Sequence, residues 1–153
     1  MSSAAADGLT TTRPKGAKVS VSLRGVGAIT LFVDDRDRAK EFYERVFDGK
    51  LAFEDESSAA FHFDNTVINL LKSTEAVELI APAAVADAAA GSRLQLTIWV
   101  DDADAACAEL ESRGVTLLNG PIDREWGLRT ASFTDPDGHI WEVASELPQA
   151  GSD

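Results

Sequence analysis

The apolar residues of this chain fall into short runs that predict strands, and each half also carries one amphipathic helical pattern. The runs at 29–33 and 96–100 are rich in β-branched and aromatic residues, which is typical of strands. After each run, apolar side chains recur with the i, i+3, i+4, i+7 spacing of a helix that buries one side. These residues are Ala39, Phe42, Tyr43, Val46 and Phe47 in the first half, and Ala103, Ala106, Cys107 and Leu110 in the second. Cys107 is therefore expected in a core, and Gly114 is expected to end the second helix.

Three more strand-like runs follow each helical pattern. They lie at 50–54, 59–63 and 67–72 in the first half, and at 116–118, 128–134 and 139–145 in the second. The last two runs are joined by Asp135-Pro-Asp-Gly138, whose proline and glycine favour a turn. Each half therefore predicts a βαβββ module, and the fold class is α+β.

The two halves are related by an internal repeat at an offset of 67 residues. Residues 28–39 align with residues 95–106, and six of the twelve positions are identical. The identical pairs are Thr30/Thr97, Val33/Val100, Asp34/Asp101, Asp35/Asp102, Asp37/Asp104 and Ala39/Ala106. Two acidic strand-to-helix junctions could look alike without common origin. Matching aspartates directly after matching strands nevertheless favour duplication of one module. In each copy, one of the two adjacent aspartates is expected to cap the helix.

The repeat sets the expected domain organisation. Module one spans about residues 23–80 and module two spans residues 93–147, so residues 23–147 form one domain. An alanine-rich connector at 81–92 joins the modules, and it is expected to hold one short helical piece after Pro82. We expect flexible tails at residues 1–22 and 148–153.

Composition and charge mainly exclude classes of partner. With 44% hydrophobic and 26% charged residues, the chain can bury a globular core. Its net charge of −12 is unfavourable for binding phosphate backbones or anionic lipid, so we expect neither nucleic acid nor a membrane as a partner. The chain shows no bilayer-spanning run, no secretory signal and a single cysteine, which favours a cytoplasmic protein.

Several motifs together give the chain a resemblance to a known family. They are Thr30-Leu-Phe-Val-Asp-Asp35, Glu41-Phe-Tyr-Glu44, Trp99-Val-Asp-Asp102, Glu125-Trp-Gly-Leu-Arg129 and Asp135-Pro-Asp-Gly-His-Ile-Trp-Glu142. Over about residues 26–146 the chain resembles the vicinal oxygen chelate superfamily, which includes glyoxalase I, extradiol dioxygenases and bleomycin-resistance proteins. The resemblance implies that two βαβββ modules form one U-shaped eight-stranded cleft, commonly completed within a homodimer.

Metal-using members of this superfamily place one ligand on the first strand and one on the last strand of each module. The resemblance carries these positions to Ala28, Asn69, Gln95 and Glu142. A divalent transition metal prefers imidazole, thiolate or carboxylate ligands, and only Glu142 supplies one. The set therefore predicts no metal and no other cofactor. A nickel, zinc, manganese or iron ion belongs only to the enzymatic alternative below.

The two histidines have different expected surroundings. If residues 64–65 form a two-residue hairpin turn, His62 lies opposite Val67, on the face that carries Asn69. His62 then either lines a pocket or is an ordinary sheet residue, with a metal ligand as a third reading. His139 is expected at a turn or on the surface. It lies three residues before Glu142, so its side chain is on the opposite face of the strand, and it directly follows the Asp-Pro-Asp-Gly motif.

Glu142 has three possible roles. It could act as a general base, it could recognise a cationic group on a ligand, or it could hydrogen-bond Gln95 and Asn69 as a residual polar cluster. The residues alone leave these roles open.

Aromatic residues favour a binding pocket. Phe32 and Trp99 are equivalent in the repeat and share the strand parity of the first-strand ligand positions, while Gly127 permits a turn beside Trp126. The resemblance places the Trp126 loop at a drug-binding cleft. Alternatively, Trp99 packs in a core and Trp126 packs against a dimer partner. Trp141 is expected in a core, and Arg129 either braces the loop by pairing with an acid or contacts a ligand.

The sequence is consistent with three functions. The leading hypothesis is a non-enzymatic, homodimeric protein of the bleomycin-resistance type that sequesters a small aromatic molecule, with a cationic one favoured by the acidic surface. Its expected ligand-binding residues are Phe32, His62, Asn69, Gln95, Trp99, Trp126 and Glu142. The alternative is a glyoxalase-like lyase or isomerase that acts on a carbonyl substrate, with Glu142 as the catalytic residue and a weak or absent metal site. The third is an interaction module without a small ligand.

Overall fold

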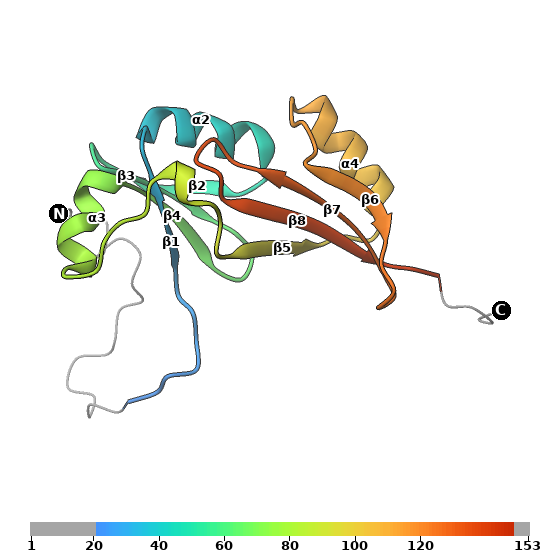
Figure 1. Ribbon diagram of the computed structural model, residues 1–153, viewed down its shortest axis with the longest axis horizontal. Helices are drawn as coiled ribbons and strands as arrows, with labels where there is room; N and C mark the ends of the chain where they lie inside the picture. Colours follow the sequence, from blue (N-terminus) through green and yellow to red (C-terminus); the bar gives the residue numbers. More distant parts are fainter. Residues whose placement is uncertain (1–20, 149–153) are drawn as a thin grey trace. The chain divides into compact units, whose positions relative to one another are not determined.

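The computed structural model describes residues 21–148 (Figure 1). Most of the two expected tails, residues 1–20 and 149–153, therefore lies outside the described residues. The chain divides into two compact units, Met1–Val85 and Ala86–Asp153. Each unit contains one four-stranded sheet with strands and helices in the βαβββ order, which confirms the predicted α+β class.

The first unit contains a sheet with the strand order β1-β4-β3-β2. Its elements are β1 (Ile29–Val33), α2 (Arg36–Val46), β2 (Lys50–Glu54), β3 (Ser58–His62), β4 (Val67–Lys72) and α3 (Ser73–Ile80). β1 pairs with β4 in the parallel direction, and the other neighbours are antiparallel. The parallel pair is possible because the connection from β1 to β4 is long and contains α2, β2 and β3.

The second unit repeats this arrangement with the strand order β5-β8-β7-β6. Its elements are η1 (Ala88–Ala90), β5 (Gln95–Trp99), α4 (Ala103–Ser112), β6 (Asn119–Asp123), β7 (Leu128–Thr134) and β8 (Ile140–Glu146). Here β5 pairs in parallel with β8, as β1 does with β4. The shared strand order confirms the internal repeat predicted from the aligned sequences.

Both main helices begin at the second aspartate of the repeated pair. The Asp35 side chain accepts a hydrogen bond from the backbone N–H of Arg38 at 3.0 Å, and Asp102 accepts one from Ala105 at 3.1 Å. Each carboxylate satisfies a backbone donor that the first helical turn leaves unpaired, and it also interacts favourably with the helix dipole. The repeated aspartates are therefore helix caps, as the sequence predicted.

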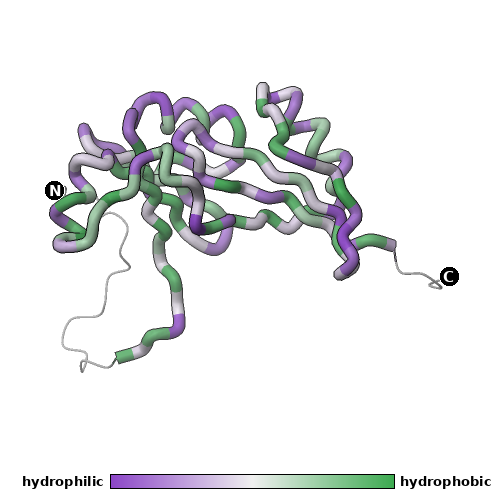
Figure 2. The backbone as a smooth tube through the Cα atoms, in the orientation of Figure 1, coloured by the Kyte–Doolittle hydropathy of each residue, from purple (hydrophilic) through white to green (hydrophobic). Residues whose placement is uncertain are grey.

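The core of the first unit lies between its sheet and α2. Tyr43 of α2 stacks on Phe61 of β3 with ring centroids 6.1 Å apart, and on Phe47 at 5.2 Å. Within each turn of α2 the backbone tube changes between hydrophilic and hydrophobic colours, as expected for a helix with one buried side (Figure 2). The buried strand residues of this unit's helix-facing side are Leu31, Val33, Ala59, Phe61, Ile68 and Leu70.

The core of the second unit lies between its sheet and α4. The backbone N–H of Ala103 donates a hydrogen bond to Ser145 Oγ at 3.1 Å, which ties the start of α4 to the face of β8 that carries Trp141. Trp141 is 3% exposed and Cys107 is buried, so both core predictions are confirmed. Burial raises the pKa of the Cys107 thiol, and the charges of Asp104 and Glu111 raise it further.

Two elements differ from the sequence-based expectation. The sequence predicts a strand at 116–118, whereas β6 spans Asn119–Asp123 and includes Gly120 and Pro121. Both residues disfavour regular strands, but β6 is an edge strand, and its pairing with β7 shifts between Asn119 and Ile122. The sequence also misses α3, which starts directly after β4. The expected helical piece in the connector is the short 3₁₀ turn η1.

Candidate ligand-binding site

In the second unit, the candidate residues share the sheet face opposite α4, which we call the far face of that unit. Thr97 pairs with Glu142 across β5 and β8, and Trp99 pairs with Ala144. Because side chains alternate along a strand, Gln95, Thr97, Trp99 and Glu142 lie on one face. Trp141 alternates with Glu142 and points to the core.

Glu142 is half-buried and has one hydrogen-bonding partner on this face. Thr97 Oγ1 donates to Glu142 Oε1 at 2.9 Å. No basic side chain pairs with Glu142 among residues 21–148, and its partner is Thr97 rather than the Gln95 of one of the three roles that the sequence left open. The negative charge of Glu142 is therefore uncompensated by the side chains of the described chain.

Trp99 extends this face with an exposed aromatic surface. Its side chain is 68% exposed, which excludes the core alternative for this residue. Trp99 lies on the neighbouring strand two positions from the Thr97–Glu142 pair. Strand spacing and rise place the Trp99 and Glu142 Cα atoms about 8 Å apart. An uncompensated carboxylate and an exposed indole thus lie on one surface.

The first unit carries the corresponding arrangement on the face opposite α2, which we call the far face of that unit. Thr30 pairs with Asn69 as Thr97 pairs with Glu142, so the repeated threonine stands beside each candidate polar residue. Asn69 is buried, and its Nδ2 donates a long hydrogen bond to Thr30 Oγ1 at 3.5 Å. Asn69 Oδ1 is buried and has no hydrogen-bond partner within the described part of the chain. A buried acceptor of this kind requires a donor from elsewhere.

The remaining candidates of the first unit differ in exposure. The predicted register is confirmed, because His62 pairs with Val67 and thus shares the face of Asn69. His62 is exposed, and Phe32 on the same face is half-buried. Ala28 is exposed and directly precedes β1. The strands therefore bring Phe32, His62 and Asn69 to one face, while their part in ligand binding remains a prediction.

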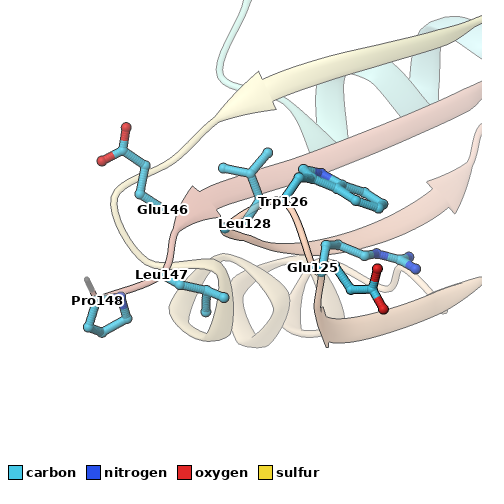
Figure 3. A pocket seen from close by; sticks show the side chains of 8 residues that line it. Glu125, Trp126, Leu128, Glu146, Leu147 and Pro148 are labelled. Atoms are coloured by element: carbon cyan, nitrogen blue, oxygen red, sulfur yellow. The ribbon is translucent and has the colours of Figure 1, made fainter. Parts of the chain in front are cut away.

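The loop between β6 and β7 forms a pocket of about 440 Å³ in the second unit (Figure 3). Its lining residues are Arg124, Glu125, Trp126, Gly127, Leu128, Glu146, Leu147 and Pro148. Trp126 is 69% exposed, and the Arg124 guanidinium lies 5.9 Å from the centroid of its ring. Trp126 was expected in a ligand site from the sequence, whereas Arg124 was not. The signal available was a basic residue two positions before an aromatic residue in a glycine-containing turn.

Arg129 braces this loop through carboxylates. Its Nε lies 2.6 Å from Asp123 and its Nη1 lies 3.0 Å from Asp104. The hydrogen bond to Asp123 and the charges of both aspartates raise the pKa of Arg129, and the hydrogen bond from Arg129 lowers the pKa of Asp123. Of the two roles that the sequence allowed, the geometry supports bracing.

His139 lies at the hairpin turn between β7 and β8, as expected. Its Nδ1 is 2.7 Å from Oδ2 of the fully buried Asp135 side chain. Burial lowers the pKa of the imidazole, but the hydrogen bond and charge of Asp135, together with the charge of Asp137, raise it more. The pKa of His139 therefore lies above its ordinary value of 6.5.

This raised pKa predicts a pH-dependent stability. The folded protein binds the His139 proton more tightly than the unfolded chain, so the stabilisation is fully present below pH 6.5 and is lost as pH rises through the folded pKa. We expect the free energy of unfolding to fall as pH rises above about 6.5, measured by urea denaturation. His139→Gln should reduce this slope. A slope that is unchanged in His139→Gln would assign the effect to other groups.

The fold and sequence assign the chain to a family. Residues 25–143 match the family model of the Glyoxalase/Bleomycin resistance protein/Dioxygenase superfamily, and the chain belongs to this superfamily. Over 123 residues it is 31% identical to the uncharacterized protein YraH of Bacillus subtilis (strain 168), a match that covers 78% of this chain and 96% of YraH.

Solved structures show the same fold. A glyoxalase/bleomycin resistance protein/dioxygenase from Nocardioides superimposes with a TM-score of 0.75 at 22% identity, over 88% of this chain and 92% of that chain. A protein of unknown function from Agrobacterium tumefaciens str. C58 gives a TM-score of 0.66 at 28% identity, over 84% and 98% of the two chains. Among the described residues, no helix is both long and apolar enough to cross a membrane.

The residues at the superfamily's metal positions do not fit a divalent transition metal. In the first unit these positions hold Ala28, which has no donor atom, and Asn69, which offers a neutral amide. In the second unit they hold Gln95, another amide, and Glu142, whose Oε1 already accepts from Thr97. Such metals favour imidazole, thiolate and carboxylate ligands. Within residues 21–148, no three His, Cys, Asp or Glu side chains group closely enough to hold a metal ion.

Proposed function

We propose that this chain is a small-molecule-binding protein of the bleomycin-resistance type, which acts as a homodimer and takes an aromatic cation on the far face of the second unit. The observation that carries the proposal is the pairing of exposed Trp99 with the uncompensated carboxylate of Glu142. A flat aromatic surface contributes contact area, and a cation on its face gains about 0.5–2 kcal/mol.

Charge supports a cationic ligand. The chain carries a net charge of −12, which raises the local concentration of cations and speeds their association. Glu142 is half-buried, so a ligand cation that pairs with it is screened less by solvent than one on the open surface. Thr97 fixes one carboxylate oxygen and leaves the other available.

Asn69 supports a polar ligand contact on the far face of the first unit. Its buried Oδ1 lacks a hydrogen-bond partner among the described residues, and a ligand N–H or O–H would satisfy it. Phe32 and His62 share this face and complete the set of proposed contacts there.

An acid–base enzyme is the second candidate, and the Thr97–Glu142 hydrogen bond favours it. A carboxylate oriented through one oxygen can use the other to accept a proton from a carbonyl substrate. In that case Glu142→Gln would abolish turnover but retain binding of a neutral substrate, whereas it should weaken cation binding if the protein only sequesters its ligand.

Calorimetric titration with two probes tests the binding proposal. Copper-free bleomycin and 2-naphthylmethylammonium are aromatic cations, and 2-naphthamide is the neutral control. We expect saturable binding of at least one cation, and about tenfold weaker binding in Glu142→Gln and in Trp99→Ala, equal to ~1.4 kcal/mol.

Glu111→Gln is the matched control, because it removes the same charge from the exposed surface of α4. It should change affinity less than twofold if the effect at Glu142 is local. Equal losses in Glu111→Gln and Glu142→Gln would place the cation elsewhere. No saturable binding of either cation at millimolar concentration would contradict the proposal.

A further inference from the structure

We infer that the pocket beside Trp126 binds a planar aromatic carboxylate, with Arg124 as its anion-binding group. This inference does not depend on the cation site proposed at Glu142. It concerns the loop between β6 and β7 and the end of β8, and it predicts a ligand of the opposite charge.

Backbone hydrogen bonds hold this loop in shape. The N–H of Arg124 donates to the carbonyl of Leu128 at 2.7 Å, and the N–H of Gly127 donates to the carbonyl of Arg124 at 3.1 Å. The N–H of Leu147 donates to the carbonyl of Gly127 at 2.9 Å, which joins the loop to the end of β8. Gly127 has φ +90°, a conformation that glycine adopts without steric strain and that turns the chain directly after Trp126.

The Arg124 guanidinium is positioned from two sides. Its Nε donates to Oγ1 of the buried Thr130 at 2.9 Å, and its Cζ lies over the Trp126 ring, 5.9 Å from the ring centroid. These contacts use one of its five N–H donors, and the two terminal nitrogens have no hydrogen bond or ion pair to any residue between 21 and 148. A fixed guanidinium fork with unused donors matches the geometry of a carboxylate.

Arg129, in the same β6–β7 hairpin, is a structural arginine with which Arg124 can be compared. It contacts Asp123 at 2.6 Å and Asp104 at 3.0 Å, so its charge is compensated within the chain. Arg124 has no such carboxylate partner among the described residues. The contrast assigns Arg129 to bracing and leaves Arg124 able to bind an external anion.

The rest of the pocket suits an aromatic body on that anion. Trp126, Leu128, Leu147 and Pro148 provide apolar walls around about 440 Å³ (Figure 3). A cationic ligand on the Trp126 ring would be repelled by the positive charge of Arg124, whereas an anionic ligand would be attracted by it. An aromatic carboxylate can therefore contact the apolar walls and pair with the guanidinium at once.

Two carboxylates also line the pocket and provide a test. In Figure 3 the carboxylate of Glu146 points away from Trp126, while Glu125 precedes Trp126 directly. If the pocket binds an anion, the Glu125 charge opposes binding. If it binds a cation, Glu125 assists. Glu125→Gln should therefore strengthen the binding of an anionic ligand and weaken the binding of a cationic ligand.

The experiment titrates the full chain in a Trp99→Phe background with 2-naphthoate, 2-naphthamide and 2-naphthylmethylammonium. In that background Trp126 is the only exposed tryptophan of the described residues, because Trp141 is buried. Quenching of tryptophan fluorescence thus reports on the pocket, and equilibrium dialysis gives the affinity. We expect 2-naphthoate to bind at least fivefold more tightly than either other probe.

Three variants locate the carboxylate. Arg124→Gln should weaken 2-naphthoate binding at least tenfold and leave 2-naphthamide unchanged, while Glu125→Gln should strengthen 2-naphthoate binding two- to fivefold. Arg113→Gln is the control, since it removes an equal charge from an ion pair with Glu109 at the end of α4. Circular dichroism checks that each variant is folded.

Several results would overturn the inference. They are preference of the pocket for the ammonium probe, weaker 2-naphthoate binding in Glu125→Gln, equal losses in Arg124→Gln and Arg113→Gln, or no 2-naphthoate binding at millimolar concentration. Failure of the cation site at Glu142 would leave all of these measurements unaffected, because Trp99 is already replaced and Glu142 is unchanged in this series.

Discussion

Gly120→Ala is expected to lower the free energy of unfolding by about 3 kcal/mol or more, because an added Cβ meets backbone that cannot move aside. A Cβ at this position would lie 2.5 Å from the carbonyl oxygen of Thr130 and 2.6 Å from the Cα of Ala131. Gly120 also has φ +93°, which strains any residue with a side chain. Urea denaturation of the wild-type protein and the variant measures the difference.

Gly91→Ala separates the two causes of this destabilisation. Gly91 has φ +84°, close to that of Gly120, but no atom lies within 4 Å of its added Cβ. It should therefore cost only the backbone strain, about 1–3 kcal/mol, because φ 84° and ψ 178° define a backbone region that is essentially restricted to glycine. Equal losses of stability in the two variants would show that the close contact between β6 and β7 contributes nothing. The steric explanation for Gly120→Ala would then be wrong.

The region around Gly120 also shows why one strand was misplaced from the sequence. Strand patterns are recognised by alternating or β-branched residues, and Asn119-Gly-Pro-Ile-Asp123 has no alternation and a single β-branched residue, Ile122. This segment is a strand because β7 pairs with it at Asn119, Ile122 and Asp123. Tertiary pairing therefore overrides the local preference, which a single sequence does not contain.

Other strands were predictable because their local pattern and their tertiary role agree. Residues 29–33, 50–54, 67–72 and 128–134 are strands at the predicted bounds. In β1, β4 and β7 the residues that favour a strand also bury their side chains, whereas β2 is an edge strand with no buried residue. The repeat then supplied the pairing, since equivalent strands occupy equivalent places in the two sheets.

The sequence predicted which sheet face each candidate site residue lies on, but not which hydrogen bonds these residues make. Strand parity correctly placed Trp99 and Glu142 on one face and Trp141 on the other. Parity does not reveal which neighbour a side chain bonds, so the sequence left the partner of Glu142 open and did not identify Thr97. The role of Arg124 depends on loop geometry and on Thr130, which is six residues away, and no sequence spacing encodes it.

Asp135→Ala is expected to lower the free energy of unfolding by about 3 kcal/mol, although this residue belongs to the motif by which the chain resembles its superfamily. The buried carboxylate accepts hydrogen bonds at Oδ1 from the backbone N–H groups of Asp137 and His139, both at 2.9 Å. Its Oδ2 contacts His139 Nδ1 at 2.7 Å. Alanine would leave these donors without their carboxylate, so the motif is a folding element of the β7–β8 hairpin.

Asp64→Ala is the matched control, because Asp64 is an exposed residue in the β3–β4 hairpin, the equivalent turn of the first unit. It removes the same charge and should change stability by less than about 0.5 kcal/mol. Asp135→Asn should fall between the two, since its amide oxygen can still accept the backbone hydrogen bonds. Denaturation curves for the three variants, with bleomycin titration of each folded protein, separate folding from function. A normal unfolding curve in Asp135→Ala together with lost ligand binding would make Asp135 a site residue, and the structural interpretation of the motif would then be wrong.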